Sequence, residues 1–168
     1  MTIKMSKSRS RANAFKVHWH GKLDDYVTDL VWSPLGDCMA VASSSGAISL
    51  WRESGLVSLS VGKSDSAINC LGFSADGHYL AAAGQLGEVL IWQVQNCEQD
   101  PVILPHSQHW IDQLSWHPVE PWLAFGVGNQ VQVWDVAQAQ SLAQLDFVKS
   151  SVLGLDWHPQ EQLLAVSG

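Results

Sequence analysis

The sequence repeats itself with a period of 41 to 43 residues. A short apolar–polar alternation ends in an aromatic residue four times, at Trp32, Phe73, Trp116 and Trp157. A second register of tryptophans follows at a similar spacing, at Trp51, Trp92 and Trp134. A fixed period near forty residues marks a repeat architecture, in which each copy is one supersecondary unit. Most of the chain is then occupied by copies of one structural unit, which makes a catalytic centre less expected.

Each copy is typical of short β-strands separated by turns. The expected first strands cover residues 27–32, 68–73, 111–116 and 152–157, each with an aliphatic residue first, Leu fourth and an aromatic residue sixth. Turn sequences such as Ser33-Pro34-Leu35-Gly36 follow them. The second strands, as in CMAVAS and YLAAAG, are nearly all apolar, which indicates burial on both faces. Third strands end at the second tryptophan register, and weaker fourth strands are expected near 56–61, 102–104 and 142–147.

The four-stranded unit, the Ser-Pro-x-Gly-like turn and the segment VQVWDV at 131–136 resemble the WD40-repeat family over residues 17–168. The resemblance implies an all-β fold, a β-propeller of four-stranded antiparallel blades. The Asp that the family places six residues before the blade Trp is replaced by Ser45 in the first copy and Leu86 in the second. We therefore expect degenerate repeats, held together by packing more than by a polar network.

The repeat boundaries are expected near residues 20–61, 62–104, 105–147 and 148–168, so that about three and a half blades are present. A propeller closes with roughly four to eight blades. We therefore expect an incomplete ring and an N-terminal fragment of a longer propeller. The alternative is an open stack of blades with bare, aggregation-prone edges. Residues 1–16 are expected to form a basic, disordered tail, and 15–19 a leading strand.

Charge is unevenly distributed between this tail and the rest of the chain. The first sixteen residues carry five cationic and no acidic side chains, whereas the remainder carries four cationic and sixteen acidic ones. The tail could contact nucleic acid or an acidic partner, but such segments are more often simply solvated. An acidic body repels phosphates, so nucleic acid is not an expected partner of the propeller.

Composition also indicates the cellular compartment of the protein. No segment approaches the roughly 18 apolar residues of a membrane span, and no apolar run follows the N-terminal basic residues as in a secretory signal. The three cysteines, Cys38, Cys70 and Cys97, lack CxxC spacing and are expected to be buried free thiols. These features favour a cytoplasmic protein that does not contact membranes.

The sequence contains no phosphate-binding glycine loop, nucleophile elbow or HExxH helix. No catalytic residue, cofactor or small-molecule partner is therefore expected. The seven histidines have no spacing that forces three or four of them to converge, as zinc requires. We expect no metal site, with a zinc site that includes His106 and His109 as the alternative. His117 and His158 replace Ser in the turns of the third and fourth copies and are expected to hydrogen-bond nearby backbone.

The repeats differ most just before each first strand, where the residues are Tyr26, Ala67, Trp110 and Ser151. In the WD40-repeat family, which this sequence resembles, these loops lie on the wider face of the propeller, where partners bind. Large aromatic residues with polar neighbours are typical of binding hot spots, although Tyr26 and Trp110 could instead cover blade edges. The predicted partner-binding residues are Asp25, Tyr26, Ser44, Ser45, Gln85, His109, Trp110 and Asn129.

Together these features predict a non-catalytic scaffold that binds protein partners through loops on one face of the propeller. Two alternatives remain open at this point. One is a metal-handling protein that uses its histidines. The other is the propeller portion of a larger regulator or enzyme whose active domain lies elsewhere.

Overall fold

The computed structural model describes residues 2–7, 16–59, 66–104, 109–146 and 150–168, with side chains described from His20 onward within these ranges. The described residues form sixteen β-strands and one short 3-10 helix. Three antiparallel sheets have four strands each, and two further sheets have two strands each. Among the described residues, no helix is long or apolar enough to cross a bilayer.

The first blade consists of β3 (Val27–Trp32), β4 (Cys38–Ser43), β5 (Ile48–Arg52) and β6 (Gly55–Ser58). The strands pair in chain order, each antiparallel to the one before. All six residues of β4 are buried, as expected of a strand covered on both faces. Gly36 ends the turn after β3 with a φ of 71°, a conformation that glycine adopts with little strain.

The second blade consists of β7 (Ile68–Phe73), β8 (Tyr79–Gly84), β9 (Val89–Gln93) and β10 (Val102–Leu104), with the helix η1 (Val94–Asn96) between the last two strands. The third blade consists of β11 (Leu114–Trp116), β12 (Trp122–Val127), β13 (Gln130–Asp135) and β14 (Gln140–Asp146). The expected fourth strands are thus present as β6, β10 and β14.

Two two-stranded sheets flank the blades. One is the hairpin of β1 (Thr2–Lys7) and β2 (Lys16–Lys22), and the other is that of β15 (Gly154–Trp157) and β16 (Leu164–Ser167). The second hairpin supplies the first two strands of a fourth blade. The predicted tail includes β1, whereas residues 8–15 lie outside the described residues. The division into tail and propeller therefore stays a prediction.

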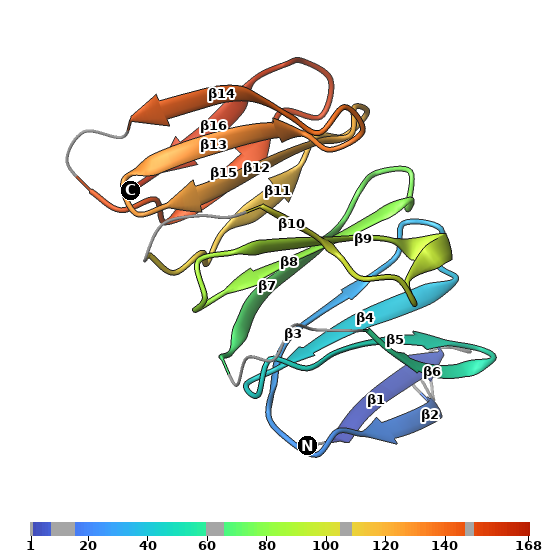
Figure 1. Cartoon of the computed structure of the whole chain (residues 1–168). Helices are drawn as coiled ribbons and strands as arrows, with labels where there is room; N and C mark the ends of the chain where they lie inside the picture. Colours follow the sequence, from blue (N-terminus) through green and yellow to red (C-terminus); the bar gives the residue numbers. More distant parts are fainter. Residues whose placement is uncertain (1, 8–15, 60–65, 105–108, 147–149) are drawn as a thin grey trace.

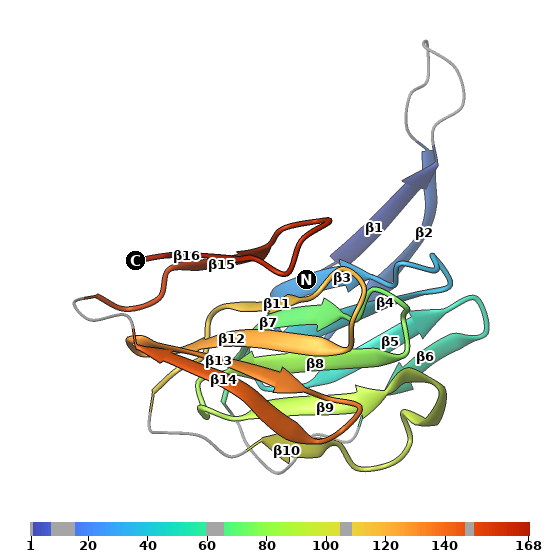
Figure 2. The same ribbon diagram turned by 90° about the horizontal axis from the view of Figure 1, so that it is seen from above.

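The blades stand one beside the next, from the β1–β2 hairpin to the β15–β16 hairpin (Figures 1 and 2). The first strands adjoin across the junctions, since β3 contacts β7, β7 contacts β11 and β11 contacts β15. The indole nitrogen of Trp116 donates to the carbonyl of Gly72 at 2.9 Å, and that of Trp157 donates to the carbonyl of Ser115 at 3.0 Å. The first aromatic register therefore joins each of these blades to the preceding one.

The apolar core lies mainly between blades. One cluster joins the first and second blades around Leu50, Leu80 and Trp92, and another joins the second and third around Ile91, Leu123 and Phe125. Each cluster draws on the second and third strands of its sheets. The expectation that packing holds the degenerate repeats together agrees with this arrangement.

The first strands of the third and fourth repeats begin later than the sequence predicts. β11 starts at Leu114 rather than at residue 111, and β15 starts at Gly154 rather than at residue 152. The earlier residues hydrogen-bond the preceding blade instead. The amide of Ile111 donates to the carbonyl of Gly84 at 3.0 Å, and the amide of Val152 donates to that of Gly128 at 2.9 Å.

Candidate functional site

Four of the predicted binding residues gather at one end of the first blade. Tyr26 precedes β3 and is 75% exposed. Its amide donates to Asp25 Oδ1 at 2.7 Å, and its carbonyl accepts from the amide of Ser44 at 2.9 Å. The backbone amide of Tyr26, followed by the hydroxyls of Ser44 and Ser45, lowers the pKa of Asp25. Asp25 is therefore a fixed negative charge beside an exposed aromatic ring.

The second exposed aromatic side chain lies at the start of the third blade. Trp110 is 59% exposed and directly precedes Ile111, whose amide is bonded to the second blade. The ring of His109 lies over the β12–β13 turn, since a Cβ on Gly128 would stand 3.3 Å from its Cδ2. Asn129, the next residue of that turn, is exposed. The structure thus brings His109, Trp110 and Asn129 together.

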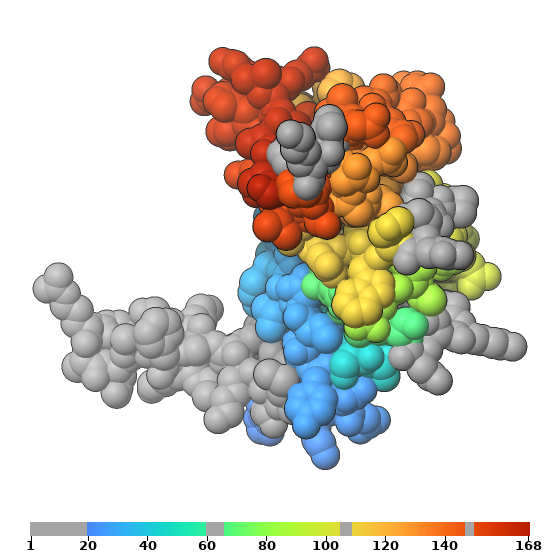
Figure 3. All heavy atoms as spheres, turned by 90° about the vertical axis from the view of Figure 1, so that its left-hand side faces the viewer, coloured from blue at the N-terminus to red at the C-terminus, as the bar shows by residue number. Residues whose placement is uncertain are grey.

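Gln85 lies between these two groups, in the β8–β9 turn of the second blade. Its amide donates to the carbonyl of Ala67 at 3.0 Å and its side chain is exposed. The second blade has the small Ala67 where the first and third blades have aromatic residues. The eight predicted residues therefore form two groups, each around one exposed aromatic side chain, on the first and third blades. Gln85 lies on the second blade, between the two groups. Figure 3 views this side of the molecule, where segments of the first three repeats adjoin.

Sequence reasoning missed the carboxylates that link first strands. Asp29 Oδ2 accepts the amide of Leu71 at 2.7 Å, and Asp112 Oδ1 accepts Asn69 Nδ2 at 2.5 Å. Asp29 lies within β3 and Asp112 lies two residues before β11; an acidic side chain in an expected first strand is the signal that could have found them. Lys22 and Arg52 are the only cationic side chains that the described part of the chain places. Among the described residues, acidic side chains therefore outnumber cationic ones.

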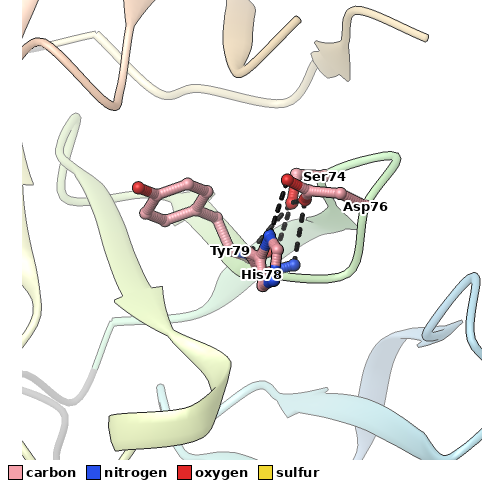
Figure 4. Close-up of polar contacts among 4 residues, drawn as sticks. All are labelled: Ser74, Asp76, His78 and Tyr79. Carbon is pink, nitrogen blue, oxygen red and sulfur yellow. Dashed lines mark hydrogen bonds and ion pairs between the residues drawn. The ribbon is translucent and has the colours of Figure 1, made fainter. Parts of the chain in front are cut away.

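Ser74, Asp76 and His78 have the residue types of a hydrolytic triad but a different connectivity (Figure 4). The Ser74 hydroxyl donates to Asp76 Oδ1 at 2.6 Å, and His78 Nδ1 lies 2.8 Å from Asp76 Oδ2. The carboxylate therefore lies between serine and histidine, whereas nucleophilic catalysis needs the imidazole against the hydroxyl. Ser74 also accepts the amide of Tyr79 and is 1% exposed. The cluster closes the turn between β7 and β8.

The two histidines that replace serine act as sequence analysis predicted. His117 Nδ1 accepts the amides of Val119 at 3.2 Å and Glu120 at 3.0 Å. His158 Nδ1 makes the same pair of bonds one repeat later, to the amides of Gln160 and Glu161. Within the ranges that the structure describes, no three His, Cys, Asp or Glu side chains are grouped to hold a metal. His106, named in the zinc alternative, lies outside those ranges.

The three cysteines are free thiols, as predicted; Cys38 and Cys97 are buried, whereas Cys70 is only partly buried. Cys70 lies at the junction of the second and third blades, where its Sγ is 3.6 Å from the carbonyl of Ile111. Burial, with the nearby carboxylates of Asp29 and Asp112, raises the pKa of the Cys70 thiol to about 12. Cys70 is therefore a weak hydrogen-bond donor across the junction and a poor nucleophile.

Comparison with known proteins gives one family match and several partial relatives. The model of the anaphase-promoting complex subunit 4 WD40 domain matches residues 32–102. The ribosome biogenesis protein WDR12 homolog of Oryza sativa subsp. japonica is 30% identical over 108 residues, which are 61% of this chain and 24% of that protein. The chromatin assembly factor 1 subunit FAS2 homolog of the same plant is 24% identical over 172 residues, covering 92% of this chain and 34% of that protein.

A solved structure of U3-55K matches with a TM-score of 0.71 at 22% identity, over 81% of this chain and 44% of that one. The chain therefore spans less than half the length of each of these proteins. Its four-stranded blades, joined through their first strands, define a β-propeller fold with an incomplete ring. The WD40 family model matches part of the chain and one relative is named WDR12, so the chain is similar to WD-repeat proteins.

Proposed function

We propose that this chain is a WD-repeat protein and a non-catalytic platform that binds protein partners through the loops before its first strands and the neighbouring turns. The observation that carries the proposal is the pair of exposed aromatic side chains, Tyr26 and Trp110, at 75% and 59% exposure. Aromatic residues of this kind supply much of the binding energy of protein interfaces. Proteins with WD40 propellers are typically non-catalytic scaffolds, which supports the same interpretation.

The rigid attachment of both loops favours binding. The carbonyl of Tyr26 is tied to the β4–β5 turn through Ser44, and Trp110 directly precedes the amide of Ile111, which is bonded to Gly84. Loops that are already ordered lose less conformational entropy when a partner binds. The polar residues around each ring, Asp25, Ser44 and Ser45 in one case and His109 and Asn129 in the other, would fix the partner's orientation. Gln85 would contribute between them.

Matched pairs of surface substitutions test the proposal. Replacing Tyr26 and Trp110 together with Ser should abolish capture of the partner proteins that the wild-type chain retains from its source cells. Leu35 and Val119 are the control, since they are 67% and 74% exposed but lie in turns at the opposite ends of the same blades. Replacing these two with Ser should leave capture unchanged. Loss with the control pair, or retention with the Tyr26 and Trp110 pair, would refute the proposal.

The proposal also covers the cellular location of the protein and the class of its partners. The sequence predicts a cytoplasmic protein, whereas one relative is named as a ribosome biogenesis protein and another as a chromatin assembly factor subunit. The nucleus is therefore the competing location, and microscopy of a fluorescently tagged chain distinguishes the two. Protein partners remain the proposed class, without nucleic acid or small molecules, since the described surface is acidic and the aromatic residues lie on an open face.

A further inference from the structure

A cavity of about 230 Å³ lies at the junction of the second and third blades. Apolar side chains and side-chain amides both line it. The wall residues are Tyr79, Ile91, Leu104, Trp134 and Val136, and the amides are those of Gln93, Asn96 and Gln99. The cavity adjoins the end of β9 and the start of β8, at the opposite end of those strands from Gln85. It is therefore separate from the proposed platform residues.

The repeats differ at this junction. At the first junction, the equivalent tryptophan, Trp92, is 1% exposed. Arg52 there reaches across to the carbonyl of Val94 at 2.7 Å. At the second junction Gln93 occupies the position of Arg52, and Trp134 is only partly buried. A larger depression of about 640 Å³ at the first junction is lined by turn residues together with Arg52, Val94 and Gln95, and Trp92 is not among its lining residues.

The strand β10 forms one wall of the cavity and is the edge strand of its sheet. Its other edge pairs with no strand among the described residues, and two of its three side chains are exposed, Val102 at 60% and Ile103 at 47%. Val102 and Leu104 line the cavity. Since side chains alternate along a strand, a segment added to this edge would direct every second side chain toward the cavity.

Charge and size define the segment that fits. Asp100 lines the cavity and the exposed Glu98 precedes it by two residues, while no Lys or Arg among the described residues lines the cavity. Basic residues that flank the inserted side chain would therefore complement these acidic side chains. A dry cavity of roughly 150 Å³ holds a benzene molecule, and drug-sized ligands need about 300 Å³ or more. A volume between these two suits a single aromatic side chain.

We propose that the edge of β10 and the adjoining cavity bind an extended peptide segment whose central aromatic side chain enters the cavity between Lys or Arg residues. The peptide adds a strand to the second blade, and its aromatic ring contacts Tyr79 and Trp134. This site is distinct from the platform of Tyr26 and Trp110, so either proposal can fail without the other. A single protein could then engage two partners, one at each end of its blades.

The test uses capped pentapeptides with the sequence Lys-Val-Phe-Val-Lys. In spectra of the ¹⁵N-labelled chain, this peptide should shift the indole N–H of Trp134 and the amide of Ala137. A peptide with Ala in place of Phe should bind at least about tenfold more weakly, because burial of the ring is lost. Proline in place of both valines should abolish binding, since proline cannot complete the strand ladder. Glutamate in place of both lysines should weaken it.

Matched variants locate the site. Ala137→Trp should fill the cavity and abolish binding of the phenylalanine peptide. Ala75→Trp is the control, because Ala75 is also an exposed alanine in a turn but does not line the cavity. The proposal is overturned if the phenylalanine and alanine peptides bind the wild-type chain equally, or if no peptide shifts Trp134 at its solubility limit. Unchanged binding by folded Ala137→Trp overturns it as well.

Discussion

Ala139 occupies a strained backbone conformation in the turn before β14. It is the one non-glycine residue with a positive φ in the described part of the chain, at 51°. An L-residue in this region is strained by roughly 1 to 2 kcal/mol. Ala139→Gly should therefore raise the free energy of unfolding by about 0.5 to 1 kcal/mol, even after the greater freedom of glycine in the unfolded chain is subtracted. Urea unfolding of both proteins measures the difference.

A neighbouring alanine provides the control for this substitution. Ala137 is exposed in the same turn and is absent from the residues with positive φ. Ala137→Gly should lower the free energy of unfolding by about 0.4 to 1 kcal/mol, because it only adds freedom to the unfolded chain. An equal effect of the two changes would show that Ala139 is not strained.

Two tryptophans that stand six residues apart have opposite roles. Trp116 donates its indole N–H to Gly72 and stacks on Tyr79, with ring centroids 6.1 Å apart. Trp116→Ala should therefore lower the free energy of unfolding by about 3 to 5 kcal/mol. Trp110 is 59% exposed, so Trp110→Ala should lower the free energy of unfolding by less than about 2 kcal/mol. Equal losses in denaturant unfolding would make Trp110 a structural residue and remove it from the proposed platform.

At the scale of an element, the turn between β7 and β8 depends on an ionised carboxylate. Burial works to raise the pKa of Asp76, but hydrogen bonds from Ser74 and His78 outweigh it and lower the pKa below the ordinary 3.8. A carboxyl with a lowered pKa in the folded state stabilises it above the unfolded-state pKa. This contribution is lost as pH falls through the folded-state value. The unfolding free energy that Asp76 contributes should therefore decline below about pH 4.

Comparison with Asp76→Asn measures this dependence. The difference in unfolding free energy between wild type and variant should be constant near neutral pH and shrink as the solution is acidified. Because Asp76 is about half exposed, the difference should be small at every pH. When both proteins also carry Ser74→Ala, the pH-dependent part of this difference in unfolding free energy should be smaller still. A difference that grows on acidification would contradict the assigned hydrogen bonds.

The repeat elements were predictable because their signals are local. The position of Leu and of the aromatic residue in each first strand, the apolar second strands and the histidines that replace Ser33 and Ser74 in the turns all depend on residues near in sequence. Bonds between blades were not predictable in this way. The bonds from Asp29 to Leu71 and from Trp116 to Gly72 join residues about one repeat apart. Such pairs become visible only when the blades are placed side by side.

The candidate site was predictable only in part, for the same reason. Comparison of the repeats singles out Tyr26 and Trp110 because their positions hold small residues in the other copies. The grouping of Asp25 with Ser44 and Ser45 follows from the antiparallel β3–β4–β5 meander, which the strand pattern implies. The cavity beside Trp134 has no sequence signal of its own. It lies where Gln93 occupies the position that Arg52 holds one repeat earlier, beside the short β10.

At the scale of the whole molecule, each blade is stabilised mainly by its neighbours, so stability should vary along the chain. In repeat architectures the total stability approximates a sum over units and the junctions between them. β8 and β12 are paired on both edges and buried almost throughout. Among the described residues β16 is paired with β15 alone, and it alternates half-buried and exposed residues. The β15–β16 hairpin therefore has the weakest attachment of the sheets whose side chains are described.

Native-state hydrogen exchange measures this gradient directly. The amides of β8 and β12 should exchange only through global unfolding, whereas those of β16 should exchange through local opening at a lower free energy. Trp157→Phe removes the indole bond to Ser115 while keeping an aromatic ring, so it should accelerate exchange in β15 and β16 and leave β8 unchanged. If β16 were as protected as β8, or if Trp157→Phe accelerated exchange in all blades equally, the blades would unfold as one cooperative unit. The bonds between first strands would then couple the entire molecule and not only adjacent blades.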